Sequence, residues 1–391
     1  MARRPELSRK YVSSRETDRL GLGLGRKIGL LDPTNKSVTD DTYATGKWDS
    51  LHRQTTVVDA YSAAVDLEYL LQGGINVVIQ ALGAEELFVR IPTHDPSEPP
   101  PRGVQTWKHV FGGPDLVERI RINIEEHLAF VKAYEDHIGL ARSEQDVRDI
   151  VKSGRIAMVM MLVSGFIAND LRVLRQYRDW GVTVMALCHL GAMEWSDSTA
   201  DLKGTPGLTE FGREVVAECN AIGVLVDLAH ASDETCRDAL EVATRPVIAT
   251  HTKCRALSNA MRYMSDDLIR TVADGGGVVS ILAPAPRISQ EAQEARLRRD
   301  ERLAETYSDP FELAAAKLAD PFSWGTKLDL ESIDHVVNIA GIDHVGLSSH
   351  FQNVPQWREF TGALLDHRYS EEDTAKILGE NVLRVIREGI G

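Results

Sequence analysis

The sequence predicts an α/β fold, a (β/α)8 barrel of the TIM type, and three observations support this prediction. Short apolar segments alternate with amphipathic segments of helical period through residues 55–391. Eight of the apolar segments have the character of strands, and each is followed by a helical pattern. The first strand is not followed by the glycine fingerprint that marks the nucleotide crevice of a doubly wound sheet.

Each element is predicted from its own pattern. Strands are expected where short runs are rich in Val, Ile, Leu and Ala, at 57–59, 75–80, 156–161, 183–187, 223–229, 247–249, 277–282 and 344–348. Helices are expected where apolar residues recur every three to four positions, at 62–71, 115–134, 169–180, 209–220, 233–243, 265–274 and 328–340. A last helix at 370–387 closes the chain.

Three stretches fall outside this alternation. Residues 1–54 are polar and are interpreted as an N-terminal extension or arm that precedes a barrel domain over 55–391. The proline-rich stretch 94–113 is expected to form a loop over the barrel mouth. The charged, helix-prone stretch 284–324 is an insertion after the seventh strand, and a lid, a subunit contact and a solvated helical insertion all fit it.

Composition argues against several classes of function. A formal net charge of −14 disfavours a nucleic-acid partner. No apolar run reaches the roughly 18 residues of a membrane-spanning helix, so no membrane partner is expected. The N-terminal residues lack the apolar segment of a secretory signal, which makes a cytoplasmic location the expectation. The four cysteines show no C-x-x-C spacing and are interpreted as reduced thiols.

Two histidines at strand ends are the first candidates for chemistry. His230 follows the predicted strand 223–229, and His251 follows the predicted strand 247–249. In a parallel barrel the carboxyl ends of consecutive strands meet at one mouth. The two imidazoles are therefore expected to share one ion or one substrate.

Five segments carry a resemblance to a known family. They are GLTEFGREVV, GVLVDLAHAS, PVIATHT, GIDHVGLSS and EEDTAKILGENVLRV. In order and spacing they resemble the membrane (renal) dipeptidase family, peptidase family M19, whose members are zinc-dependent barrel hydrolases of the amidohydrolase type. The resemblance covers residues 56–390 and implies a barrel of the metal-dependent hydrolase type.

The resemblance also implies an altered metal site. The family holds two zinc ions with a His-x-Asp pair after the first strand, a bridging Glu after the third, and histidines after the fifth and sixth, which match His230 and His251. Of the other three positions, one holds a poor zinc ligand, Tyr61, and two hold no substitute for the family's ligands, Ala63 and Ser164. The resemblance therefore implies at most one zinc ion, with His350 as a candidate third ligand.

Further site residues are implied by the same resemblance. His350 stands where the family has an aspartate that takes part in proton transfer, so it is expected to bind metal or to act as an acid/base. His189 corresponds to a histidine that polarises the scissile carbonyl. Arg262 corresponds to an arginine that grips the substrate carboxylate, with Tyr263 in place of an asparagine. Tyr61 either fills the vacated metal space or donates a proton.

Carboxylates near the strand ends have more modest roles. Asp59 is expected to be a buried hydrogen-bond acceptor that supports the end of the first strand, because an unpaired buried carboxylate is costly. Glu194 and Asp197 either supply a compensating metal ligand or belong to a solvated loop.

Three functional interpretations remain open. The first is a divergent dipeptidase-like hydrolase with at most one zinc, which cleaves an amide or related bond of a small carboxylate-bearing molecule and is poor on ordinary dipeptides. The second is a metal-independent acid/base enzyme (lyase, isomerase or tailoring enzyme) that reuses the pocket. The third is a non-catalytic binding or assembly protein. Because the family often forms dimers, the resemblance leaves a homodimer as an expectation.

Overall fold

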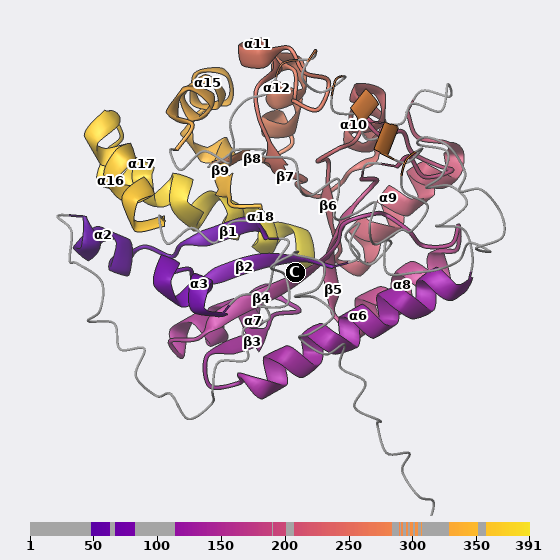
Figure 1. Cartoon of the computed structure of the whole chain (residues 1–391), viewed down its shortest axis with the longest axis horizontal. Coiled ribbons are helices and arrows are strands. Elements are labelled where there is room, and N and C mark those ends of the chain that lie inside the picture. Colours follow the sequence, from indigo (N-terminus) through magenta and orange to yellow (C-terminus); the bar gives the residue numbers. More distant parts are fainter. Residues whose placement is uncertain are drawn as a thin grey trace, which may run out of the picture.

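A computed structural model of the chain describes residues 48–62, 67–82, 114–189, 191–200, 207–283, 328–350 and 357–391, together with isolated positions between 289 and 306. The described part is a parallel sheet that curves toward a closed barrel and is covered by helices (Figure 1). The predicted α/β barrel is confirmed. The loop 94–113, the residue Ala63 and most of the insertion 284–324 lie outside the described residues.

The strands follow the order β1-β2-β4-β5-β6-β7-β8-β9, and all neighbours are parallel. A parallel bridge between Ser62 and His350 joins the first strand to the last. A short strand absent from the sequence prediction, β3, pairs with β4. The strands are β1 Val58–Ser62, β2 Val77–Leu82, β3 Ile138–Leu140, β4 Ile156–Leu162, β5 Val182–Ala186, β6 Leu225–Asp227, β7 Ile248–Thr252, β8 Val278–Leu282 and β9 Val345–Ser348.

Helices fill the connections between strands, as the alternation predicts. Several begin at a serine or threonine whose side chain accepts a main-chain N–H of the first turn, for example Thr209, Ser232 and Ser265. The helices are α2 Asp49–Gln54, α3 Leu67–Gly73, α6 Pro114–Ala133, α7 Glu144–Lys152, α8 Leu171–Trp180, α9 Glu210–Ile222, α10 Asp233–Val242, α11 Arg255–Ser258, α12 Asp266–Asp274, α15 Leu330–Ala340, α16 Trp357–His367, α17 Glu371–Ala375 and α18 Asn381–Ile390.

The C-terminal segment differs from the single helix predicted at 370–387. A π-helical turn, η4 Lys376–Glu380, separates α17 from α18. Gly379 of this turn lies against the carbonyl oxygen of Thr56, where no side chain would fit. The wider turn therefore lets the segment pack closely beside β1, and α18 then contacts β1, β6, β8 and β9.

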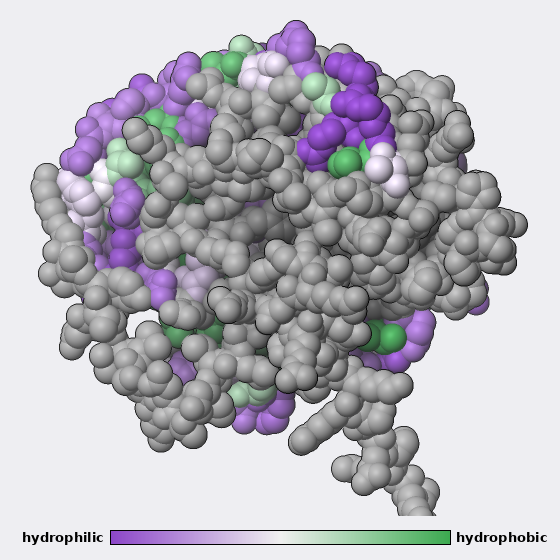
Figure 2. Space-filling model, in the orientation of Figure 1, coloured by the Kyte–Doolittle hydropathy of each residue, from purple (hydrophilic) through white to green (hydrophobic). Residues whose placement is uncertain are grey.

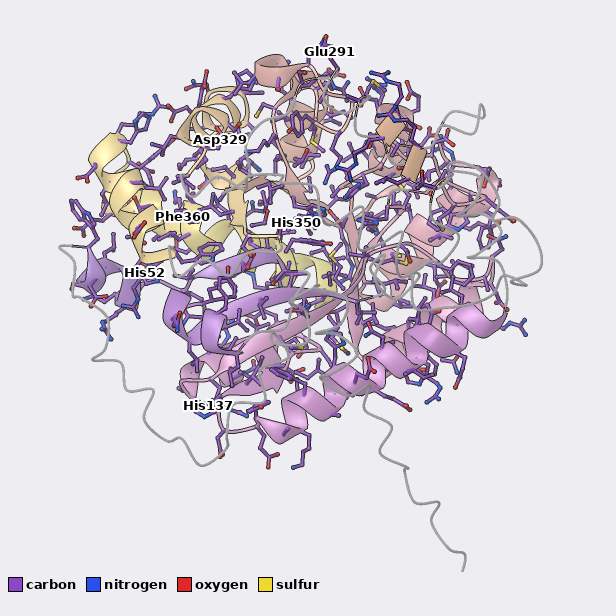
Figure 3. All side chains as sticks on the ribbon, in the orientation of Figure 1. His52, His137, Glu291, Asp329, His350 and Phe360 are labelled. Atoms are coloured by element: carbon purple, nitrogen blue, oxygen red, sulfur yellow. The ribbon has the colours of Figure 1, made fainter. Side chains whose placement is uncertain are left out.

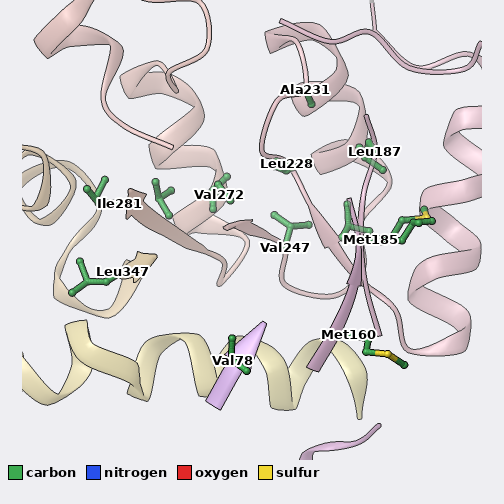
Figure 4. Close-up of a cluster of buried hydrophobic side chains, with 14 of the residues drawn as sticks. Val78, Met160, Met185, Leu187, Leu228, Ala231, Val247, Val272, Ile281 and Leu347 are labelled. Carbon is green, nitrogen blue, oxygen red and sulfur yellow. The ribbon is translucent and has the colours of Figure 1, made fainter. Parts of the chain in front are cut away.

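The core has two layers because alternate strand residues face opposite sides. One layer lies on the inner face of the curved sheet. It contains strand residues such as Ile79, Val159 and Ile248, together with Val382 and Ile386 of α18. The other layer lies between the sheet and the surrounding helices, and Figure 4 shows part of it. With both faces of the sheet buried, only its strand ends are left to form a polar site.

The described surface is mostly polar. Hydrophilic residues predominate among the coloured atoms in Figure 2, and among the described residues only Ile122 and Met261 are large apolar side chains with substantial exposure. None of the described helices has the length and apolar character needed to cross a bilayer.

The described end of the predicted arm, residues 48–54, contains a helix. This helix is α2, in which His52 is buried against α16 and α3. Its ring nitrogens lie 2.7 Å from Thr361 Oγ1 and 2.9 Å from the carbonyl oxygen of Gly73. The described part of residues 1–54 thus packs against the barrel.

Candidate active site

The carboxyl ends of five strands bring together the aromatic and imidazole side chains that were predicted to form the site. Tyr61 and His251 belong to β1 and β7, whereas His189, His230 and His350 follow β5, β6 and β9. Ring centroids lie 4.3 Å apart for His189 and His230, 5.0 Å for His230 and His251, and 5.3 Å for His251 and His350. His350 is seen among the strand ends in Figure 3. The predicted convergence of these histidines is therefore present in the structure.

His230 and His251 face each other through the same ring atom. Their Nε2 atoms are 3.0 Å apart, which is a hydrogen-bonding separation. The same separation also allows both nitrogens to bind one ion or one substrate atom. The Nδ1 atom of His230 is buried and has no hydrogen-bond partner among the described residues. The pair is thus arranged to share one proton or one ion.

Tyr61 packs directly on this pair. Its ring is 1% exposed and stacks on His251, with ring centroids 3.8 Å apart and an interplanar angle of 22°. A second contact, at 5.2 Å, joins Tyr61 to His350. The ring therefore occupies space beside the imidazoles, as one of the two predicted roles for Tyr61 requires.

Two of the histidines have a backbone conformation that is uncommon for residues with a side chain. His230 has φ of +71° and His350 has φ of +65°, both in the left-handed region. Such conformations cost free energy and cluster at functional sites. The two residues turn the chain sharply at the strand ends, where their side chains meet the other rings.

Two buried carboxylates lie below the ring cluster and brace it. Asp227 accepts main-chain N–H groups from Ala229 at 3.0 Å and Thr250 at 2.8 Å, and the Thr250 hydroxyl lies 2.8 Å from its other oxygen. Thr250 Oγ1 is in turn 2.8 Å from His251 Nδ1. The carboxylate thus supports the segment that carries His251.

Asp59 makes the equivalent arrangement in β1. It accepts main-chain N–H groups from Tyr61 at 3.2 Å and Ser349 at 2.9 Å, together with the Ser349 hydroxyl. Tyr69 adds a longer contact of 3.4 Å. The expected role of Asp59 as a buried hydrogen-bond acceptor is therefore seen in the structure.

Arg262 is hydrogen-bonded to the end of β7 that carries His251. Its Nη2 donates to the carbonyl oxygen of His251 at 2.7 Å. Burial lowers the pKa of Arg262, and the positive charge of Arg262 adds to burial in lowering the pKa of His230 and His251 well below the usual value. Tyr263, beside it in sequence, is 6% exposed. Contact of either residue with a substrate stays a prediction.

The electrostatic state of the site follows from burial. Burial, together with Arg262, lowers the pKa of His189 to about 3. Burial raises the pKa of Asp227 to about 6 and that of Asp59 to about 7. At neutral pH the imidazoles of His189, His230 and His251 are therefore neutral, which is the form that binds metals and accepts protons.

The two other candidate carboxylates, Glu194 and Asp197, follow β5 in the chain. The main-chain oxygen of Asp197 accepts from Ser232 at 3.0 Å and from the Thr235 hydroxyl at 3.2 Å, and the residue is buried. Glu194 accepts a hydrogen bond from Asn169 in an exposed setting. The solvated loop expected as one alternative therefore fits Glu194 but not Asp197, which is buried.

The family is settled by a comparison over almost the whole barrel. The family model of membrane dipeptidase, peptidase family M19, matches residues 38–389. The chain belongs to this family. It is a family of dipeptidase-like hydrolases, so the resemblance drawn from the five sequence segments is confirmed.

Individual relatives agree with the M19 assignment. Dipeptidase tcpJ of Claviceps purpurea is 28% identical over 337 residues, which cover 83% of this chain and 69% of that protein. Dipeptidase aclJ of Aspergillus oryzae is 29% identical over 323 residues, which cover 78% of this chain and 67% of that protein.

Solved structures show the same fold. The probable dipeptidase PvdM from Pseudomonas aeruginosa aligns with a TM-score of 0.69 at 22% identity, over 87% of this chain and 97% of that chain. A metallo peptidase from Rhodobacter sphaeroides aligns with a TM-score of 0.62 at 18% identity, over 86% and 99%. At these identities the likeness concerns the barrel fold.

The facing imidazole nitrogens of this M19 chain are of a type that binds zinc. Zinc–imidazole bonds are about 2.0–2.1 Å long, so the Nε2 atoms of His230 and His251, 3.0 Å apart, can bind the same ion. Ser164 offers a buried hydroxyl with no hydrogen-bond partner in the described part of the chain, and a hydroxyl is a poor replacement for a bridging carboxylate. Within the described ranges no three His, Cys, Asp or Glu residues surround a common metal position. A third ligand from His350 stays a prediction.

Sequence reasoning missed the residues that support the rings. Thr250 and Ser349 each precede a site histidine and contact a carboxylate on another strand. Asp227 gave a usable signal, because it is the one charged residue in the apolar segment GVLVDLA. A charge inside a buried strand needs hydrogen-bond partners, and here two of them come from Thr250, on the strand that carries His251.

Proposed function

We propose that the protein is a divergent dipeptidase-like hydrolase that cleaves an amide or related bond of a small carboxylate-bearing molecule. The observation that carries the proposal is the facing pair of Nε2 atoms of His230 and His251, 3.0 Å apart, with Arg262 bound to the same strand end. Membership of the M19 family supports hydrolysis as the reaction class.

Zinc fits this pair as a single ion held by His230 and His251, and when bound it would polarise a carbonyl and activate water. The chain's own residues bind and orient the substrate. His189, neutral at physiological pH and 4.3 Å from His230 by ring centroids, is suited to stabilise negative charge on the carbonyl oxygen. His350, in contact with Tyr61, is suited to move a proton to or from the leaving group.

Arg262 supplies the expected specificity for a carboxylate. A guanidinium carries five N–H donors in a planar fork, and the His251 carbonyl oxygen accepts from one of its nitrogens, Nη2. The same side chain can therefore brace β7 and bind a substrate carboxylate. Burial of the guanidinium strengthens such a charge pair, because the local dielectric is low.

Ordinary dipeptides are expected to be poor substrates. The positions that would complete a second zinc site hold Tyr61 and Ser164, neither of which supplies a carboxylate base. Amides, lactams and N-acyl amino acids, which still carry a carboxylate, are the preferred candidates.

The test combines metal content with hydrolysis. Protein purified without chelator is analysed for zinc per chain, as wild type and as the double variant His230→Ala/His251→Ala, and is assayed on dipeptides and N-acyl amino acids. His137→Ala serves as a matched control, because His137 is exposed and lies away from the strand ends (Figure 3). About one zinc per chain that is lost only in the double variant, with hydrolysis lost in parallel, supports the proposal.

A metal-independent acid/base enzyme is the second candidate. Two observations favour it. His230 and His251 lie at a hydrogen-bonding separation, and the described residues contain no group of three His, Cys, Asp or Glu side chains that could hold a metal ion. Chelated wild-type protein that still converts a small acid, with no zinc bound at saturating concentration, would support it over the hydrolase. A stable protein partner with neither zinc nor turnover would instead support the non-catalytic interpretation.

A further inference from the structure

Asp227, Thr250, His251 and His230 form an unbroken series of side-chain contacts below and within the ring cluster. The series runs from Asp227 Oδ2 to Thr250 Oγ1 at 2.8 Å, then to His251 Nδ1 at 2.8 Å. It ends where His251 Nε2 meets His230 Nε2 at 3.0 Å. All four residues are buried, so water does not compete with these contacts.

The direction of the first contact follows from the carboxylate. Asp227 already accepts two main-chain N–H groups on Oδ1, from Ala229 and Thr250. Burial raises the pKa of Asp227 only to about 6, so the group is ionised at pH 8 and can only accept hydrogen bonds. Thr250 must therefore donate its hydroxyl proton to Oδ2.

The hydrogen bond between Thr250 Oγ1 and His251 Nδ1 then has only one possible donor. A hydroxyl has a single proton, and the proton of Thr250 is committed to Asp227. Oγ1 of Thr250 can therefore only accept from His251, so Nδ1 of His251 must carry its proton. In a neutral imidazole the other ring nitrogen, Nε2, is then unprotonated, and its lone pair faces His230.

We infer that Asp227 and Thr250 are positioning residues that hold His251 as its Nδ1–H tautomer, with the Nε2 lone pair kept toward the site. His230 has no comparable restraint, because its Nδ1 has no hydrogen-bond partner among the described residues. His251 is thus the fixed member of the pair, and His230 is the member that adapts to a proton or an ion.

The inference extends the proposed function. Its consequence for turnover rests on that function, whereas the tautomer itself does not. Residues that orient a functional imidazole typically contribute roughly 10- to 100-fold to metal affinity or activity. The tautomer of His251 is therefore measured directly by NMR, and the effect on turnover is measured separately by enzyme kinetics.

The experiment uses the full chain, perdeuterated and labelled with ¹⁵N at histidine, in chelator at pH 8. Long-range ¹H–¹⁵N spectra distinguish protonated from unprotonated ring nitrogens, and His251→Gln assigns the signal. Wild type should show His251 as Nδ1–H. Thr250→Val, which removes the hydroxyl at nearly constant shape, should shift His251 mainly to Nε2–H, and Thr250→Ser should restore Nδ1–H.

Thr252→Val is the matched control, because Thr252 lies on the same strand and is buried but contacts neither Asp227 nor His251 through its hydroxyl. It should leave the His251 tautomer unchanged. An Nε2–H tautomer in wild type, or an unchanged tautomer in folded Thr250→Val, overturns the inference.

Kinetics then separate the two proposals. If wild type hydrolyses an N-acyl amino acid, Thr250→Val should lower kcat by roughly 10- to 100-fold with little change in KM, and Thr250→Ser should recover most of it. Wild type without hydrolysis but with the Nδ1–H tautomer refutes the proposed function and leaves the inference standing. Hydrolysis with the other tautomer refutes the inference alone.

Discussion

Ser349 donates both its main-chain N–H and its hydroxyl to the carboxylate of Asp59, and the two residues lie 290 positions apart in the chain. Asp227 and Thr250 repeat this arrangement between β6 and β7. In both cases the donor directly precedes a site histidine, His350 or His251. Two carboxylates on β1 and β6 thus fix the neighbouring strand ends from which the histidines project.

Ser349→Ala should destabilise the protein, and more so at high pH. The substitution removes one donor from a carboxylate that is fully buried, which costs about 1–3 kcal/mol when the group is ionised. Burial raises the pKa of Asp59 to about 7, so the carboxyl is neutral in the folded state at pH 5. Urea unfolding at pH 5 and pH 8 should show the larger loss at pH 8.

The direction of this pH dependence follows from the difference between the pKa of Asp59 in the folded state and its ordinary value. The pKa of Asp59 in the folded state lies above its ordinary 3.8, so the stability it contributes is greatest below pH 4 and is lost as pH rises toward 7. The exposed Ser50→Ala is a suitable control and should change the free energy of unfolding by less than about 0.5 kcal/mol at either pH. A loss that is larger at pH 5 would contradict this account.

His52 should make the free energy of unfolding decrease in mild acid. Burial lowers the pKa of His52 from 6.5 to about 4, because the charged imidazolium is kept from water, and the hydrogen bond to the carbonyl oxygen of Gly73 offsets this only in part. The folded pKa is depressed, so the stabilisation is complete above pH 6.5 and is lost as pH falls toward 4. From pH 8 to pH 5 the loss is about 2 kcal/mol.

His52→Gln isolates this contribution. The variant should be less stable than wild type at pH 8, since it loses packing and hydrogen bonds against α16. It should lose less on acidification, so the gap in unfolding free energy narrows by about 2 kcal/mol at pH 5. Parallel pH curves for the two proteins would show that His52 does not control this window.

Much of this site was predictable because strand ends are visible in the sequence. The apolar runs before His230 and His251, and their place in an alternating pattern, are local features that predict convergence at one mouth. The hydroxyl–carboxylate pairs are not local, since Asp59 and Ser349 meet only when β1 closes on β9. No periodicity in the sequence encodes that contact.

The fold prediction failed at elements that are short or constrained by packing. Strand β3 has three residues, too few for an alternating pattern. The predicted C-terminal helix is interrupted at η4, where Gly379 meets the Thr56 carbonyl of the segment before β1. The left-handed backbone at His230 also has no sequence signal, because glycine is the residue that normally marks such a position.

Tyr61 should contribute mainly through its ring. It is 1% exposed and stacks on His251, so Tyr61→Ala should leave a cavity and lower the unfolding free energy by about 3–5 kcal/mol. Tyr61→Phe keeps the ring and is the matched control, with a loss smaller by at least about 2 kcal/mol. Chemical denaturation measures both. Equal losses for the two variants would mean that the phenol hydroxyl, not the stack, provides the stabilisation.

Arg262 should determine preference for a carboxylate on the substrate. Charge-assisted hydrogen bonds contribute about 1.5–3 kcal/mol, so Arg262→Lys, which keeps the charge but not the planar fork, should raise KM for an N-acyl amino acid by roughly 10- to 150-fold. The matching carboxamide, which lacks the negative charge, should be a poor substrate for wild type and should be nearly unaffected by the variant. Because Arg262 Nη2 also donates to the His251 carbonyl oxygen, circular dichroism and unfolding must show an intact fold in the variant. An equal loss of kcat/KM on both substrates would mean that Arg262 acts by bracing β7 and not by binding the carboxylate.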